Sequence, residues 1–151
     1  MIEGEKMNYE IRRLETGDIE SLLELFSGIF KSKIQAKCLY DLVDNDNVID
    51  LVAIMDNKVI GHANVDIRIN LFTGEKYFYL NYFCVHENYR CYGIGGKLID
   101  KLEELALQNN ISFMEFTSGN KRLAAHSFYR GKGYEIRDTS VFIKYFNKEQ
   151  V

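Results

Sequence analysis

Residues Tyr79 to Leu107 read YLNYFCVHENYRCYGIGGKLIDKLEELAL, which places an apolar strand, a glycine-rich loop and an amphipathic helix in direct succession. The strand is expected over Leu80 to Val85, and the loop Arg90 to Gly96 opens into the helix. The first turn of a helix leaves four backbone N–H groups without partners and carries a partial positive charge. Glycines in the loop leave these donors accessible, and Arg90 adds a permanent cation. The stretch therefore predicts an anion site that suits a phosphate.

The spacing of the glycines separates the known kinds of phosphate loop. A nucleoside-triphosphate loop, G-x-x-x-x-G-K-[ST], would need glycine at Cys91 and serine or threonine at Leu98. A dinucleotide loop, G-x-G-x-x-G, would need a glycine at Leu98. The pattern that fits is R-x-x-G-x-G, with Arg90, Gly93 and Gly95. A tight strand-to-helix turn without a ligand is the alternative that this hexapeptide alone leaves open.

The hexapeptide resembles the pyrophosphate loop of the GNAT superfamily of N-acetyltransferases, whose members hold acetyl-CoA across the strand-to-helix turn. A second stretch carries the same resemblance. It has a strand over Phe113 to Thr117, a polar turn, a short helix over Ala124 to Arg130 and the pair Gly133-Tyr134. This is similar to the family's closing motif, A-h-x-F-Y-x-x-x-G-[FY]. With both motifs in the family's order, the resemblance covers roughly Tyr9 to Phe146, nearly the whole chain.

The resemblance implies acetyl-CoA as the co-substrate and a role for each matching residue. Tyr129 matches the tyrosine that protonates the departing thiolate in many members, although a core aromatic is the plainer interpretation of a tyrosine on a short helix. The pyrophosphate is expected on backbone donors of residues 91–96, the pantetheine along Leu80 to Val85, and an oxyanion on an N–H of that strand. The cofactor-binding residues expected are Phe83, Cys84, Val85, Arg90, Cys91, Tyr92, Gly93, Ile94, Gly95, Gly96, Asn120 and Arg122.

Asn81 departs from the family near the place where many relatives carry a glutamate or an aspartate. That carboxylate usually relays the proton of the attacking amine, directly or through water. An asparagine cannot accept a proton, but it can orient a water molecule. Asn81 is therefore expected as a catalytic residue beside Tyr129, without the role of a base.

The resemblance says less about the roles of two other sets of residues. Relatives commonly carry an asparagine seven places before the tyrosine; here that place is Arg122, and Asn120 lies two residues earlier. Arg122 is expected to contact the cofactor or to order the loop, and a solvated arginine is the alternative. His62 and His86 have no partner that the sequence identifies, so both are expected to be structural. His126 in the closing helix is expected to pack and to bond to the backbone, and a catalytic base is the alternative.

Length and composition predict one domain, residues 1–151, with residues 1–7 as a loose end. The formal net charge is −3 and the sequence pI is about 5.6, which argues against nucleic acid as a partner. No run approaches the roughly 20 apolar residues of a membrane span. The three cysteines lack the spacing of a metal site, so no metal is expected, and their odd number favours a reducing cytoplasm.

Periodicity predicts the remaining elements and an α/β (α+β) fold with a mixed, mostly antiparallel, GNAT-like sheet flanked by helices, in the order βααβββ-αβ-αββ. The strands expected are Tyr9 to Arg13, Val48 to Met55, Val59 to Leu71, Lys76 to Val85, Phe113 to Thr117, Tyr134 to Arg137 and Ser140 to Phe146. The helices expected are Thr16 to Phe30, Ile34 to Leu42, Ile94 to Gln108 and Ala124 to Arg130.

These observations predict an acetyl-CoA-dependent N-acetyltransferase that moves the acetyl group directly to a primary amine. A small molecule is the acceptor that the closing motif favours, and a homodimer is compatible with the resemblance. A peptide or protein N-terminus is the alternative acceptor. A non-catalytic acyl-CoA sensor is the alternative from another class, which the amide at Asn81 favours and the retained Tyr129 argues against.

Overall fold

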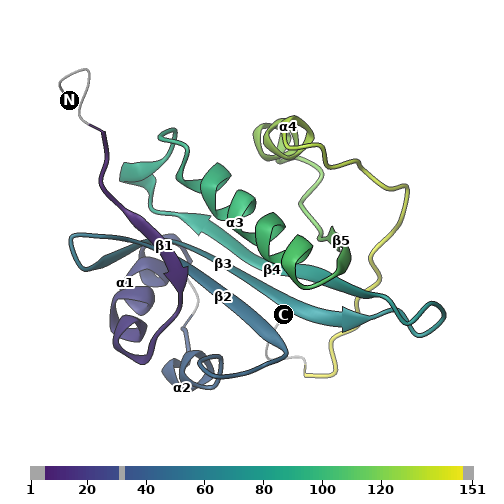
Figure 1. Cartoon of the computed structure of the whole chain (residues 1–151), viewed down its shortest axis with the longest axis horizontal. Helices are drawn as coiled ribbons and strands as arrows, with labels where there is room; N and C mark the ends of the chain where they lie inside the picture. Colours follow the sequence, from purple (N-terminus) through teal and green to yellow (C-terminus); the bar gives the residue numbers. More distant parts are fainter. Residues whose placement is uncertain (1–5, 31–32, 148–151) are drawn as a thin grey trace. The chain divides into compact units, whose positions relative to one another are not determined.

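Five strands form one sheet in the order β1-β2-β3-β4-β5, as Figure 1 shows. The computed structural model describes residues 6–30 and 33–147 and divides the chain into two compact units after Thr117, which are treated separately below. The strands are β1 Glu10–Arg13, β2 Val48–Met55, β3 Lys58–Ile69, β4 Lys76–Val85 and β5 Ile111–Glu115. Neighbouring strands are antiparallel except β4 and β5, which are parallel. The predicted mixed, mostly antiparallel sheet is confirmed.

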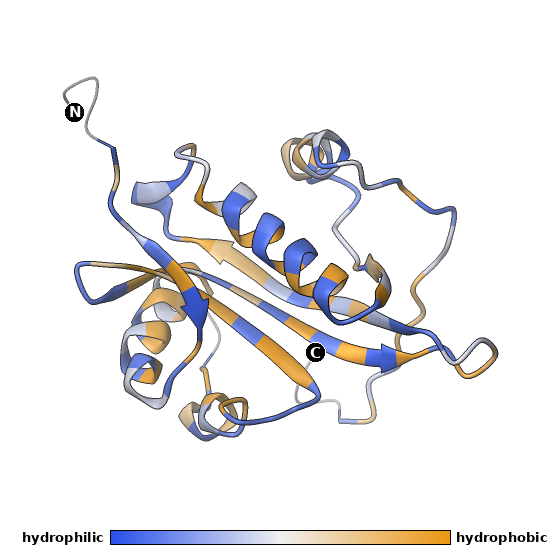
Figure 2. Cartoon of the chain, in the orientation of Figure 1, coloured by the Kyte–Doolittle hydropathy of each residue, from blue (hydrophilic) through white to orange (hydrophobic). Residues whose placement is uncertain are grey.

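The β2–β3 hairpin forms where the sequence predicts it. Its two turn residues, Asp56 and Asn57, both have positive φ angles, 50° and 61°. Such a turn matches the right-handed twist of the flanking strands, and asparagine and aspartate tolerate it well. Hydrophobic and hydrophilic residues alternate along these strands and along the helices (Figure 2).

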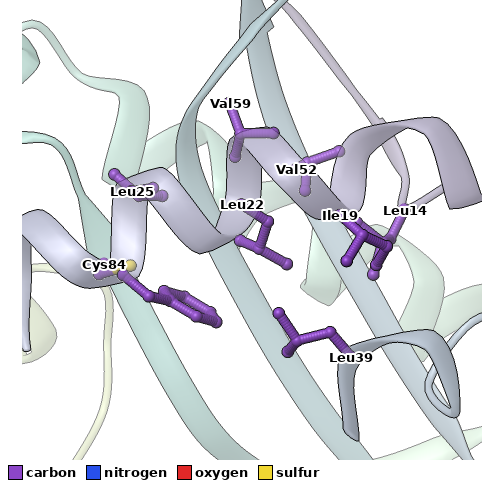
Figure 3. Packing of buried hydrophobic residues seen from close by; sticks show 9 residues of the cluster. Leu14, Ile19, Leu22, Leu25, Leu39, Val52, Val59 and Cys84 are labelled. Atoms are coloured by element: carbon purple, nitrogen blue, oxygen red, sulfur yellow. The ribbon is translucent and has the colours of Figure 1, made fainter. Parts of the chain in front are cut away.

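Helices α1 (Ile19–Ile29) and α3 (Ile94–Gln108) cover opposite faces of the sheet. On β3 the ring of His62 lies 5.1 Å from that of Phe26 on α1, whereas the neighbouring Gly61 faces Leu98 on α3. Successive residues of a strand point to opposite faces, so the two helices must lie on different sides. The cluster under α1 and α2 (Ala36–Tyr40) is drawn in Figure 3 and comprises Leu14, Ile19, Leu22, Leu25, Phe26, Leu39, Val52, Val59 and Cys84.

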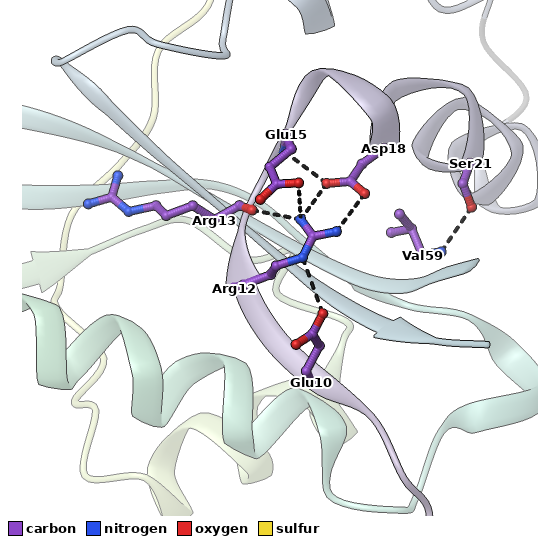
Figure 4. Close-up of polar contacts among 7 residues, drawn as sticks. All are labelled: Glu10, Arg12, Arg13, Glu15, Asp18, Ser21 and Val59. Atoms are coloured by element: carbon purple, nitrogen blue, oxygen red, sulfur yellow. Dashed lines mark hydrogen bonds and ion pairs between the residues drawn. The ribbon is translucent and has the colours of Figure 1, made fainter. Parts of the chain in front are cut away.

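Two predicted helices are shorter in the structure. The helix expected over Ile34 to Leu42 is α2 alone, because the chain tightens after Tyr40 into turns that bond Leu42 to Leu39 and Val43 to Tyr40 at the i−3 spacing. The helix expected from Thr16 begins as a 3₁₀ turn, η1 (Thr16–Asp18), before α1. Glu15, not Thr16, holds the cap position, and its backbone N–H donates to Asp18 Oδ2 at 2.8 Å (Figure 4).

The second unit, residues 118–151, contains α4 (Leu123–Gly131), and the described residues that follow it, 132–147, form no strand. The predicted strands Tyr134 to Arg137 and Ser140 to Phe146 are therefore wrong for this structure. A narrow turn, in which Thr139 N–H donates to Arg137 O at 3.0 Å, lies between them. A lone two-stranded hairpin is marginal in water, and β-forming residues alone do not supply a third strand to pair with.

Residues 1–5 of the predicted loose end lie outside the described part of the chain. Among the residues that the structure describes, no helix is both long and apolar enough to cross a membrane.

Candidate active site

The two halves of β4 have different neighbours. The strand pairs with β3 over nearly its whole length, from Lys76 to Val85. Its pairing with β5 ends at Tyr79, which lies opposite Glu115. Within the described strands, the stretch from Leu80 to Val85 thus has a partner on one side only. Its other edge presents backbone donors and acceptors at the place where the sequence predicts the pantetheine arm.

Asn81 occupies a β-bulge at the point where β4 leaves β5. On β3, Asn64 pairs with Tyr82 and Val65 pairs with Leu80, so Asn81 is the extra residue of β4. A bulge leaves one residue out of the ladder and redirects its side chain. The side chain of Asn81 is exposed, and its Nδ2 donates to Asn64 Oδ1 at 2.9 Å. The residue predicted as catalytic therefore stands at the opening of the sheet.

The loop between β4 and α3 is held by local bonds. After the 3₁₀ turn η2 (Glu87–Tyr89), Arg90 turns back and its Nε donates to Val85 O at 3.0 Å. His86 Nδ1 accepts from the backbone N–H of Asn88 at 3.1 Å, which gives this histidine the structural role that was expected. Arg90 thus fixes the loop to the end of the strand in addition to supplying positive charge.

Among the described residues, no side chain makes a cap hydrogen bond at the start of α3. Gly93 is the cap residue with φ +81°, no side-chain cap bond is present, and the first turn holds no acidic residue. The first intrahelical bond runs from Lys97 N–H to Gly93 O at 3.0 Å. Backbone N–H groups of residues 94–96 precede it and have no partner within the helix. Free donors at a helix start are what an anion site needs, so the pyrophosphate site on this loop stays a prediction.

Packing against β4 is a second reason for a glycine at position 95, besides access for a phosphate. A Cβ built at this position would lie 3.1 Å from Phe83 Cζ and 3.7 Å from Val85 Cγ2 on β4. The glycine therefore lets the helix approach the strand closely. The sequence motif identified the position, but this packing role follows only from the three-dimensional arrangement.

Cys84 turns its side chain away from the helix α3. Its thiol belongs to the buried cluster under α1, and burial raises the thiol pKa to about 12. Only its backbone is left for the cofactor role that was predicted. Phe83 and Val85 alternate with it and face α3 at Gly95.

In the second unit, Tyr129 lies near the end of α4. Gly133, with φ +91°, ends the helix in a Schellman motif, in which Tyr134 N–H donates to Tyr129 O at 3.0 Å and Gly133 N–H donates to Arg130 O at 2.9 Å. The ring of Tyr134 packs edge-on against that of Tyr129, with centroids 6.4 Å apart. The Gly-Tyr pair of the closing motif therefore fixes the tyrosine predicted as the acid.

The hydroxyl of Tyr129 is tuned by two opposing effects. Burial raises its pKa above the ordinary value of a tyrosine, and the positive charge of Arg122 acts in the other direction. Arg122 stands at the cap position of α4, and Asn120 lies in the turn before it; both side chains are exposed. The predicted residues Asn120, Arg122 and Tyr129 thus belong to one unit, and those from Asn81 to Gly96 belong to the other.

A buried polar group that sequence reasoning missed lies behind Asn81. Asp50 on β2 contacts His62 and Asn64 on β3, and Asn64 contacts Asn81 on β4. His62 was interpreted as a residue without an identifiable partner, and Asp50 was not singled out. The signal that could have found them is a polar residue at an inward position of an otherwise apolar strand.

Comparison with known proteins decides the family. The model of the acetyltransferase (GNAT) family matches residues 19–134. The chain belongs to this family. It is an N-acetyltransferase, and its acetyl donor is acetyl-CoA.

Solved structures of similar fold include several acetyltransferases. An aminoglycoside acetyltransferase from an uncultured soil metagenomic sample, in complex with trehalose, is 22% identical, with a TM-score of 0.80 over 93% of this chain and 97% of that one. The enzyme AAC(6')-Iy, in complex with the bisubstrate analogue CoA-S-monomethyl-acetylneamine, is 17% identical, with a TM-score of 0.79 over 91% and 98%. A ribosomal-protein-alanine N-acetyltransferase from Brucella melitensis biovar Abortus 2308 is 18% identical, with a TM-score of 0.78 over 91% and 99%.

Proposed function

We propose that this N-acetyltransferase transfers the acetyl group of acetyl-CoA directly to a primary amine of a small molecule, in the cytoplasm. The observation that carries the proposal is the open edge of β4, which leads through a short loop into the bare start of α3. This arrangement offers an extended arm strand-like hydrogen bonds and offers the diphosphate at its end a set of backbone donors. The three cysteines are free, which agrees with a reducing compartment.

In the proposed reaction the neutral amine nitrogen attacks the acetyl carbonyl carbon. The carbonyl oxygen becomes negative and is stabilised by a backbone N–H of β4 near Phe83 to Val85. The C–S bond then breaks, and Tyr129 donates its proton to the leaving sulfur. The phenolate left on Tyr129 then takes up the proton that the amine loses, which restores the phenol. Holding the amine beside the thioester supplies much of the rate, because a bimolecular step becomes intramolecular.

The small-molecule acceptor is supported by the closing motif and by the aminoglycoside acetyltransferases among the similar structures. A peptide or protein N-terminus is the second candidate acceptor, favoured by the fold similarity to a ribosomal-protein-alanine N-acetyltransferase. Membership of an acetyltransferase family argues against the non-catalytic acyl-CoA sensor, which was the alternative from another class. The amide at Asn81, which cannot take the amine's proton, is the one feature in favour of the sensor.

The experiment is an acceptor panel with acetyl-CoA, in which the free thiol released is measured against a no-acceptor blank. The panel contains spermidine, sisomicin, tyramine and a peptide that begins with alanine. Turnover of one of the first three, with product mass increased by one acetyl group, supports the proposal. Turnover of the peptide alone supports the second candidate. Tight binding of acetyl-CoA without release of thiol in any reaction supports the sensor.

A further inference from the structure

A chain of three side-chain hydrogen bonds crosses the sheet from a buried carboxylate to the surface. Asp50 Oδ1 lies 2.8 Å from His62 Nε2 and accepts from Asn64 Nδ2 at 3.0 Å. Asn64 Oδ1 in turn accepts from Asn81 Nδ2 at 2.9 Å. Asp50, His62 and Asn64 are buried, whereas Asn81 is exposed. The chain therefore connects the interior under α1 with the opening of β4.

The carboxylate gives this chain one direction. An ionised carboxylate only accepts hydrogen bonds, so the nitrogen of the Asn64 amide must face Asp50. The oxygen of the same amide must then face Asn81, which has to present its nitrogen. Asn81 is left with its side-chain oxygen as the atom that the chain does not use. A flexible asparagine on the surface would have no such preference.

The polar groups of this cluster are not all satisfied by hydrogen bonds. Asp50 Oδ2 and His62 Nδ1 are buried and make no hydrogen bond within the described residues. Buried polar atoms without partners cost free energy, and apolar side chains of the same size often serve a core better. Packing alone therefore explains this polar cluster poorly. Holding the side-chain oxygen of Asn81 in one direction would give the cluster a function.

We infer that Asp50 and Asn64 are positioning residues that turn the side-chain oxygen of Asn81 outward, where it accepts a hydrogen bond from the amino group of the acceptor amine. The inference rests on the proposed function and adds a means of amine recognition to it. Asn81 stands at the bulge where β4 leaves β5, next to the edge proposed for the pantetheine arm. Its oxygen orients the nitrogen by an N–H bond and leaves the nitrogen lone pair for the attack, without taking the proton.

The test breaks the chain at its middle. Asn64→Leu keeps the size of a buried residue but removes both bonds, so Asn81 can rotate freely. We expect KM for the best amine among spermidine, sisomicin and tyramine to rise about tenfold, with KM for acetyl-CoA within twofold of the wild-type value. The matched control, Ile60→Val, changes another buried residue of β3 outside the chain and should leave both KM values unchanged. If Asn64→Leu does not fold, Asn64→Ala is the replacement.

A double-mutant cycle tests the direction of the chain. Asn81→Asp places an acceptor against Asn64 Oδ1, and the Asn64 amide cannot turn because Asp50 also demands its nitrogen. Adding Asp50→Asn releases that demand, because an amide at position 50 can offer its nitrogen to Asn64 Oδ1 while Asn64 Nδ2 turns to the new carboxylate. In the wild-type background an amide at position 50 can still offer its oxygen to Asn64 Nδ2, so we expect Asp50→Asn to change KM for the amine by less than threefold there and to lower it at least fivefold in the Asn81→Asp background.

The outcomes separate the inference from the proposed function. Transfer by the wild type with an unchanged amine KM in Asn64→Leu overturns the inference alone, and so does an equal effect of Asp50→Asn in both backgrounds. A parallel rise in KM for acetyl-CoA also overturns it, because that would indicate a general distortion of β4. No transfer by the wild type to any amine removes the proposed function, and the inference with it.

Discussion

The starts of α1 and α3 lie in the same unit and differ in the side chains that surround them. The turn that leads into α1 is closed by its own side chains. Asp18 accepts from the backbone N–H of Glu15, and the guanidinium of Arg12 binds both oxygens of Asp18 at 2.6 and 2.9 Å (Figure 4). Glu20 adds a negative charge in the first turn of α1. The turn before α1 is thus closed by a capping box between Glu15 and Asp18, although Asp18 makes no side-chain cap bond to α1 itself.

The start of α3 has none of these features. It begins at a glycine with positive φ, no acid stands in its first turn, and no side chain caps it. Unpaired donors at a helix start are a cost unless water or a ligand satisfies them. A chain that places a capping box and acidic side chains before one helix, and glycines before the next, separates a structural end from a binding end. The predictions below test that separation, beginning with the largest effect.

The first prediction concerns the proton transfer from Tyr129, which is a separate step from cofactor binding at the start of α3. Tyr129→Phe keeps the ring and its contact with Tyr134 but removes the proton. We expect kcat to fall by roughly 10²–10⁴, with the Kd for acetyl-CoA within twofold of the wild-type value. Steady-state rates and calorimetry measure the two quantities. Tyr134→Phe is the matched control, since it keeps the packing and removes the neighbouring hydroxyl. A fall in kcat of less than threefold, with chemistry rate-limiting, would make Tyr129 a core residue.

The second prediction makes the start of α3 resemble that of α1. Gly93→Asp puts a carboxylate at the cap position, where no other atom lies within 4 Å of a Cβ. The carboxylate would occupy the donors and repel the pyrophosphate, so the Kd for acetyl-CoA should rise about 100-fold. Gly93→Asn is the control, because it has the same shape and the same positive φ without the charge. Equal Kd values for the two variants would mean that the pyrophosphate does not bind at this helix start.

The third prediction extends the contrast to proton transfer, because the opening of β4 carries an amide where a base would be expected. With no carboxylate to take the proton, the enzyme must use amine that is already neutral. For an amine with a pKa near that of lysine, about 10.4, kcat/KM should rise about tenfold per pH unit from pH 6 toward that pKa. The measurement uses two amines of different pKa. A plateau near pH 7 for both would show that a group of the enzyme accepts the proton.

The fourth prediction concerns the turn before α1, where Arg12 binds Asp18. The bond from Arg12 lowers the pKa of Asp18, so Asp18 stabilises the fold fully above the unfolded carboxyl pKa of about 3.9. This contribution is lost as the pH falls through the lower, folded value. At pH 7, Asp18→Asn should lower the free energy of unfolding by about 1–2 kcal/mol, after allowance for partial exposure, and Tm by about 2–6 °C.

Two controls sharpen this last test. As the pH falls through the lowered, folded pKa of Asp18, the difference between the wild type and Asp18→Asn should shrink toward zero, because the carboxyl is then protonated in both states. Glu10→Gln, which removes a more exposed partner of the same arginine, should cost less. The Kd for acetyl-CoA should not change in either variant. A rise of more than threefold in Asp18→Asn would contradict the separation of the two helix starts.

The sequence predicted what local pattern can determine. The strands, the helix α3 and the loop from Arg90 to Gly96 follow from periodicity and from glycine spacing. The bonds among Asp50, Asn64 and Asn81 could not be predicted, because they depend on the register of three strands and on one bulge. The packing role of Gly95 against Phe83 depends on how closely a helix approaches a strand. The strands predicted after Tyr134 failed because β propensity does not supply a pairing partner.

The one-sided pairing of β4 also bears on solubility. Among the described strands, none pairs with the outer edge of this stretch; an apolar strand edge of this kind is a template onto which another chain can add, and proteins usually block it with charge, proline or a covering segment. The stretch from Leu80 to Val85 contains none of the charged or proline residues that would do so. An arm of acetyl-CoA bound there would itself act as the blocking group. Occupancy by the cofactor should then suppress self-association during expression and storage, and preparations stripped of acetyl-CoA should aggregate sooner at the same protein concentration.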